Sequence, residues 1–163
     1  MTTPTYEQTI KKFPEVYDAI RAEYNEFEMP ISMGDEWHYC FHFLKRCRNR
    51  KTKQCNIWLG EIKHDIESPK PSYSKRHLLN SRGTPISHPG DLYTTYIHKG
   101  MVILAGLSLG FKLKHDPTKS PNFILANWMN INRHEYDRAV RDWYVALSDK
   151  KIAVAADGAS YHE

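Results

Sequence analysis

The segment from Trp37 to Ile66 constrains the fold of this chain more than any other. It contains all three cysteines, three of the nine histidines and the densest positive charge in the sequence. Six of the nine residues from Lys45 to Lys53 are lysine or arginine, and none is acidic. Apolar residues recur on both sides of this basic run, so we predict two packed elements joined by a basic connection.

The two flanks of the basic run favour helices. A helix is predicted over 55–67 by apolar residues at helical spacing: Cys55, Trp58, Leu59, Ile62 and Ile66. A second helix is predicted over 36–47 by a nearly continuous stripe of Trp37, Phe41, Leu44 and Cys47. The aromatic residues before Leu44 also alternate as they would on a strand, so a β-hairpin across 37–60 is the alternative.

Further helices are predicted before and after this segment. Thr3 and Pro4 fit a helix cap followed by proline in the first turn. Pro14 begins an amphipathic helix over 14–28. Asp91 is predicted to cap a helix that runs to about Leu109, and its centre is apolar on every side, as is typical of a buried helix.

The carboxyl-terminal third is predicted to hold two more helices. Gly110 fits a helix stop, and a short helix is expected over 121–128. Asn132 and Glu135 then resemble a capping box before a helix over 133–149. The last residues, 152–163, are small and polar, and we expect a weakly ordered tail.

Length and composition favour one domain. A chain of 163 residues with 40% apolar residues can bury a core without disulfides. We therefore predict an all-α or α-dominated single compact domain of about six helices, spanning 1–151 and interrupted by a long loop over 68–90. That loop is rich in proline and serine, and it carries basic residues but no acid.

The same features exclude some classes of protein. The longest apolar run, Met101 to Phe111, has 11 residues, whereas a membrane span needs roughly 20, so no membrane partner is expected. The polar start from Met1 to Tyr6 predicts no signal peptide. An odd number of cysteines without a secretion signal favours reduced thiols and a cytoplasmic location.

Positive charge supplies the first candidate site. Clustered lysine and arginine attract phosphates through Coulomb attraction and counterion release, and arginine adds bidentate hydrogen bonds. Trp58 or Tyr73, if exposed, could stack on unpaired bases. The predicted basic face comprises Lys45, Arg46, Arg48, Arg50, Lys51, Lys53, Lys75, Arg76 and Arg82, with Lys70 nearby.

Histidine and cysteine supply a second candidate, a zinc site. Helical histidines at i and i+4 can reach one ion, and two thiolates could complete a tetrahedron around it. The residues in question are His38, His42, Cys47 and Cys55, with Cys40 between them. The spacing contains no CxxC pair, so the competing interpretation is that Cys40, Cys47 and Cys55 are small buried apolar residues.

A histidine–aspartate set is the third candidate. His64 and Asp65 follow a helical segment, His38 or His42 lies upstream, and Asp157 lies downstream. In helical surroundings this resembles the H…HD…D arrangement of the HD-domain phosphohydrolases. The resemblance implies that His38, His64, Asp65 and Asp157 hold a divalent metal that activates water against a phosphoester.

Taken together, these patterns favour a small, non-catalytic accessory protein. We expect it to bind nucleic acid or an acidic protein partner through the basic face, without a cofactor. A metal-dependent phosphohydrolase of the HD type is one alternative. The other is an inhibitor or assembly protein acting by protein–protein contact through aromatic residues such as Tyr93, Tyr96 or Tyr144, although most of these should be core.

Overall fold

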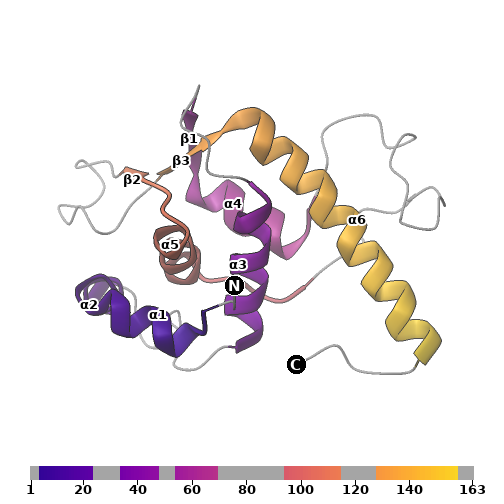
Figure 1. The fold of residues 1–163 in the computed structure, drawn as a ribbon, viewed down its shortest axis with the longest axis horizontal. Helices are drawn as coiled ribbons and strands as arrows, with labels where there is room; N and C mark the ends of the chain where they lie inside the picture. The colour runs from indigo at the N-terminus through magenta and orange to yellow at the C-terminus, as the bar shows by residue number, and fades with distance from the viewer. Residues whose placement is uncertain (1–3, 24–33, 48–53, 70–93, 115–127, 158–163) are drawn as a thin grey trace.

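The computed structural model describes residues 4–23, 34–47, 54–69, 94–114 and 128–157 (Figure 1). Within these ranges the chain forms a helix-dominated compact fold with one small antiparallel sheet, as the sequence predicts. The helices are α1 Tyr6–Lys12, α2 Pro14–Glu23, α3 Gly34–Arg46, α4 Leu59–Glu67, α5 Lys99–Ser108 and α6 Arg133–Asp157. The strands are β1 Gln54–Trp58, β2 Leu113–Lys114 and β3 Trp128–Asn132, in the spatial order β1-β3-β2.

The apolar helix α5 lies at the centre of the fold. Its residues from Gly100 to Ala105 are buried on every side, as its all-round apolar pattern predicts. It contacts α1, α2, α3, α4 and β2. In Figure 1 the sheet lies above α5, the pair α1 and α2 lies below it, and α6 runs along the opposite side of the molecule.

Helix α5 begins seven residues later than predicted, because hydrogen bonds hold the residues just before it in a non-helical conformation. The predicted cap Asp91 lies outside the described residues, and His98 is the observed N-cap. The buried carboxylate of Glu67 accepts a hydrogen bond from the backbone N–H of Ile97 at 2.8 Å. The buried carboxylate of Glu36 accepts from the N–H of His98 at 2.5 Å. Buried amides need such partners outside regular structure.

The end of α5 matches the prediction. Gly110 has φ 84°, a left-handed conformation that favours glycine. The N–H of Phe111 donates to the carbonyl of Gly106, and the N–H of Gly110 donates to Leu107. This pair of bonds is the Schellman arrangement that ends helices.

The prediction of a helix over 55–67 is half wrong. Residues 54–58 form β1, and only Leu59 to Glu67 are helical. The predicted apolar stripe joined strand residues to helix residues. Leu59, Ile62 and Ile66 face the core from α4, whereas Cys55 and Trp58 lie on β1 and are exposed. The hairpin alternative is also wrong, because β1 pairs with β3, some seventy residues later, and 34–46 is helical as predicted.

The amino-terminal helices depart slightly from their predicted limits. Thr5, not Thr3, caps α1 through a reciprocal capping box with Gln8. The predicted proline of the first turn, Pro4, instead lies before the cap, where its carbonyl accepts a hydrogen bond from the indole of Trp37 at 2.7 Å. Helix α2 begins at Pro14 as predicted, and residues 24–28 of its predicted range lie outside the described residues.

The carboxyl-terminal helix α6 begins where it is predicted. The side-chain oxygen of Asn132 accepts a hydrogen bond from the N–H of Glu135 at 3.0 Å. Helix α6 then continues to Asp157, so part of the expected tail is helical. Trp128 lies in β3 rather than in the short helix expected over 121–128. The rest of that helix and most of the 68–90 loop lie outside the described residues.

No helix in the described part of the chain has the length and apolar character that a membrane crossing requires.

Candidate nucleic-acid interface

Alternate residues of the three strands give the sheet two unlike faces. Ile57, Met129 and Ile131 point to one face and are buried. The Cβ that alanine would have at Gly106 of α5 would collide with the side chain of Met129, so this glycine lets α5 approach the sheet closely. On the inner face, Met129 therefore packs directly against α5.

The residues between these positions form what we call the outer sheet face. Two cross-strand rows define it. In the first, Trp58 pairs with Trp128, and Trp128 pairs in turn with Lys114. Trp58 is 48% exposed, Lys114 is exposed and Trp128 is partly exposed. Side chains directly opposite one another project from the same face of a sheet.

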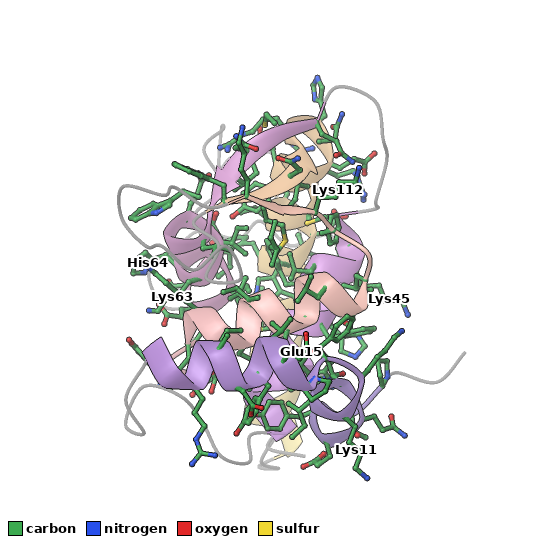
Figure 2. The ribbon with its side chains drawn as sticks, turned by 90° about the vertical axis from the view of Figure 1, so that its left-hand side faces the viewer. Lys11, Glu15, Lys45, Lys63, His64 and Lys112 are labelled. Carbon is green, nitrogen blue, oxygen red and sulfur yellow. The ribbon has the colours of Figure 1, made fainter. Side chains whose placement is uncertain are left out.

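The second row is amide-rich. Asn56 pairs with Asn130. The N–H of Asn130 donates to the carbonyl of Lys112 at 2.9 Å, which continues the register of β2 by one residue. Lys112 is exposed and lies near the sheet at one end of the molecule (Figure 2).

A third pair, Gln54 and Asn132, completes the face, and Asn132 also caps α6. The outer sheet face thus consists of Gln54, Asn56, Trp58, Lys112, Lys114, Trp128, Asn130 and Asn132, with no acid among them.

Neighbouring helices hold Trp58 in place. Its indole lies over Gly60, where an added Cβ would be only 2.7 Å from the ring. The ammonium of Lys99, at the start of α5, lies 5.8 Å from the ring centroid, within the range of a cation–π interaction. The indole is therefore packed on one helix and accompanied by a positive charge from another.

Most of the predicted basic face lies outside the described residues: Arg48, Arg50, Lys51, Lys53, Lys75, Arg76 and Arg82, together with Tyr73. Lys45 is exposed on α3. Arg46 is partly buried, because its guanidinium lies 5.1 Å from the ring centroid of Trp143 and donates to the carbonyl of His42 at 2.8 Å. Burial lowers the pKa of Arg46.

The predicted zinc ligands are only partly brought together. His38 and His42 have ring centroids 4.2 Å apart on α3. Cys47 is buried, which raises the pKa of its thiol, and Cys40 is buried likewise. Cys55, expected to be buried, is exposed on β1. Among the described residues, no group of three or more histidine, cysteine, aspartate or glutamate side chains is placed to hold a metal ion.

The residues of the HD-like set have separate partners. His64 is exposed, and its Nδ1 lies 3.2 Å from the carboxylate of Glu67. Asp65 accepts a hydrogen bond from the hydroxyl of Tyr136 at 2.5 Å, and burial raises its pKa to about 6. His38 lies on α3, and Asp157 is the last residue of α6. The local contacts of His64 and Asp65 are thus to α4 and α6 side chains.

The aromatic residues considered for protein contact differ in burial. Tyr144 is buried, as expected for most of them, but Tyr96 is 55% exposed, with the ammonium of Lys63 4.1 Å from its ring centroid. Tyr93 lies outside the described residues.

The outer sheet face itself was missed at the level of sequence. The alternation of Gln54, Asn56 and Trp58, and of Trp128, Asn130 and Asn132, is its signal. The sequence instead predicts 55–58 as part of a helix, Trp128 as the end of a short helix and Asn132 as a helix cap. Of the residues on this face, only Trp58 is predicted from the sequence to stack on bases if it is exposed.

Comparison of the chain with protein-family models, with curated proteins and with solved structures finds no significant match.

Proposed function

We propose that the protein binds single-stranded nucleic acid on the outer sheet face. The observation that carries this proposal is the chemistry of that face: two tryptophans, four side-chain amides and two lysines, with no acid, on the face of the sheet opposite the buried side chains of Ile57, Met129 and Ile131. Unpaired bases stack on exposed aromatic side chains, and a sheet surface is a common platform for this in RNA-binding domains.

Each kind of residue has a distinct role in the proposal. Trp58 and Trp128 stack on bases, which is sequence-tolerant because every base has a flat π-face. Asn56 and Asn130 offer both donors and acceptors to base edges. Lys112 and Lys114 contact phosphates, and they make binding dependent on salt. Lys99 adds a third positive charge beside Trp58.

Intrinsic tryptophan fluorescence provides a direct test. The sequence has four tryptophans, and Trp37 and Trp143 are only 3% and 4% exposed. Stacking bases should therefore quench the emission of Trp58 and Trp128. We expect oligothymidylate and oligouridylate, which do not self-pair, to quench it saturably. Trp58→Ala should weaken binding by about 1–3 kcal/mol, and Trp58→Phe by less. No quenching in low salt would refute the proposal.

A matched pair of variants separates binding by the outer sheet face from attraction by net charge alone. Lys112→Ala/Lys114→Ala and Lys11→Ala/Lys12→Ala each remove two positive charges from a net of +4. Lys11 lies at the opposite end of the molecule from Lys112 (Figure 2). We expect the first variant to lower the slope of log K against log salt by about 1.4, at roughly 0.7 per phosphate contact. Equal losses in both variants would mean attraction by net charge alone.

A polymer that carries negative charge but no bases distinguishes an acidic protein partner from nucleic acid. Polyglutamate offers negative charge but nothing that can stack on Trp58 or Trp128. We expect it to bind more weakly than oligothymidylate at equal charge concentration. Equal binding, with emission unquenched, would favour an acidic protein partner over nucleic acid. In the phosphohydrolase alternative, His64 and Asp65 would have to leave their partners Glu67 and Tyr136 in order to bind a metal.

A further inference from the structure

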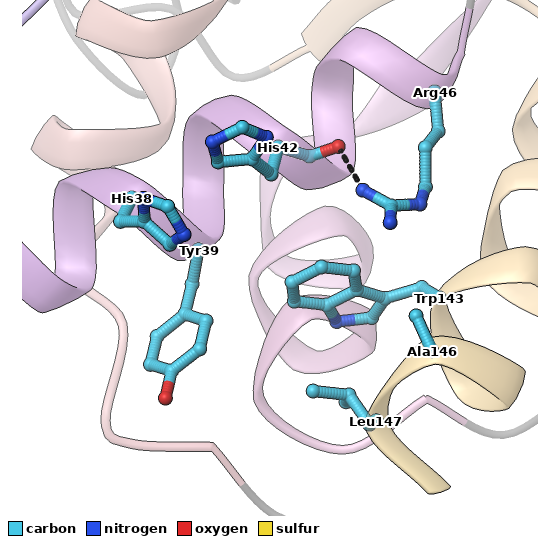
Figure 3. Close-up of a pocket in the computed structure, with 7 residues that line it drawn as sticks. All are labelled: His38, Tyr39, His42, Arg46, Trp143, Ala146 and Leu147. Atoms are coloured by element: carbon cyan, nitrogen blue, oxygen red, sulfur yellow. Dashed lines mark hydrogen bonds between the residues drawn. The ribbon is translucent and has the colours of Figure 1, made fainter. Parts of the chain in front are cut away.

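A cleft separate from the sheet lies between α3 and α6 (Figure 3). Its volume is about 190 Å³, below the roughly 300–1,000 Å³ of sites for drug-sized ligands. Helix α3 contributes four residues on one face, and α6 contributes three. The lining residues are His38, Tyr39, His42, Arg46, Trp143, Ala146 and Leu147.

The α6 wall of the cleft is apolar. Trp143 and Leu147 are largely buried, and Ala146 is partly exposed. The indole N–H of Trp143 donates to the carbonyl of Ile66 at 3.1 Å. Tyr39 packs edge-to-face on Trp143 with ring centroids 6.1 Å apart. This floor suits a flat apolar body more than a polar one.

The α3 wall carries one guanidinium and two imidazoles. His38, His42 and Arg46 lie at successive turns, and Figure 3 shows the two imidazoles beside each other on α3 with Arg46 one turn further on. The guanidinium is held in position by its stacking on Trp143 and its bond to the carbonyl of His42. None of the seven lining residues is acidic. The charge of Asp142 attracts the Arg46 guanidinium, but its carboxylate accepts a hydrogen bond from Arg138 at 2.9 Å.

We infer that this cleft binds a small organic anion: a carboxylate or phosphate monoester attached to one flat apolar ring. The ring lies against Trp143 and Leu147, and the anionic group faces Arg46 and the histidine pair. A guanidinium prefers planar oxyanions because it can donate two parallel hydrogen bonds. Imidazoles donate through a ring N–H in either charge state. The partly desolvated charge of Arg46 gains a counter-ion when the site is filled.

The inference can be tested with benzoate and phenyl phosphate as probes. Benzamide lacks the charge, and inorganic phosphate lacks the ring. The readout is the indole N–H signal of Trp143 in a ¹⁵N-labelled protein, assigned from its absence in Trp143→Phe. We expect saturable shifts of this signal with benzoate or phenyl phosphate and much weaker ones with both controls. No saturable shift, or an equal response to benzamide or to inorganic phosphate, would overturn the inference.

Variants on α3 sharpen the test. Arg46→Met should weaken probe binding roughly tenfold or more, the usual effect of losing charge-assisted hydrogen bonds. The matched control is Lys45→Met, which removes the same charge from the neighbouring exposed position and should leave binding unchanged. Because Arg46 also packs on Trp143, a second variant is needed. His38 is exposed, so His38→Ala should keep the fold and still weaken binding severalfold. Unchanged affinity in both cleft variants would refute the site.

This site does not depend on the proposed nucleic-acid interface. Lys112→Ala/Lys114→Ala should leave benzoate binding intact, while His38→Ala should leave oligothymidylate binding intact. A loss of benzoate binding in the lysine variant would place the probe on the sheet and overturn the assignment to the cleft.

Discussion

The inner and outer faces of the three-stranded sheet come from alternate residues of the same strands, yet they differ in polarity and in how deeply most of their side chains are buried. On the inner face, Ile57, Met129 and Ile131 are buried and Met129 packs against α5, whereas Cys55 at the start of β1 is exposed. The outer face is aromatic, amide-rich and basic, and part of it is open to solvent. One face therefore determines whether the sheet forms, whereas the other is available for binding.

The largest expected effect separates the two faces within one strand. Ile131 is buried and its neighbour Asn130 belongs to the outer sheet face. Ile131→Ala should lower the free energy of unfolding by about 2–5 kcal/mol, because it removes buried methylene groups and leaves a cavity. Asn130→Ala should change it by less than about 1 kcal/mol. Urea denaturation measures the free energy of unfolding of both variants. Similar losses in the two would contradict the proposed difference between the faces.

Charge provides the second test, since the outer sheet face has no acid whereas Asp65 of α4 is a partly buried carboxylate bonded to Tyr136. Burial raises the pKa of Asp65 to about 6 from 3.8. The folded state therefore binds this proton more tightly than the unfolded state. The contribution of Asp65 to stability is greatest at low pH and is lost as the pH rises through about 6.

Asp65→Asn should remove this dependence. The amide oxygen can still accept the hydrogen bond from Tyr136 without carrying a charge. We expect Asp65→Asn to gain stability relative to the natural chain between pH 4 and pH 8, by about 1–2 kcal/mol. Thermal unfolding at the two pH values measures this. A difference that is constant with pH, or that changes in the opposite direction, would contradict it.

The smallest expected effect compares two glycines. Gly106→Ala places a Cβ against Met129 on the inner face, so we expect a loss of about 1 kcal/mol after the gain in helix propensity. Gly60→Ala places a Cβ 2.7 Å from the exposed indole of Trp58. Because that ring can move toward solvent, this variant should change tryptophan emission and oligonucleotide binding more than stability. A larger stability loss at Gly60 than at Gly106 would reverse the comparison.

Local signals in the sequence predicted several elements correctly. Pro14 marks the start of α2, Asn132 caps α6, and Gly110 ends α5. The all-round apolar pattern of 101–105 identified the buried central helix. These features depend on residues within a few positions of one another, so their physical causes are contained in short stretches of chain.

The errors arose where a distant partner determines the conformation. Residues 54–58 fit the spacing of a helix with Leu59 and Ile62, but pairing with 128–132 makes them a strand. The start of α5 moved to Lys99 because the carboxylates of Glu36 and Glu67 hold the preceding amides. Neither partner is near in sequence.

The sequence by itself determined that this chain forms a helix-dominated fold around a buried apolar helix, because periodicity and caps are local properties. Only the tertiary structure decided which side chains share a surface. Trp58 and Trp128 become neighbours through strand register, and Arg46 meets Trp143 through the packing of α3 against α6. Both candidate sites depend on contacts between residues seventy or more positions apart, and such contacts form only when the buried faces of the elements pack together.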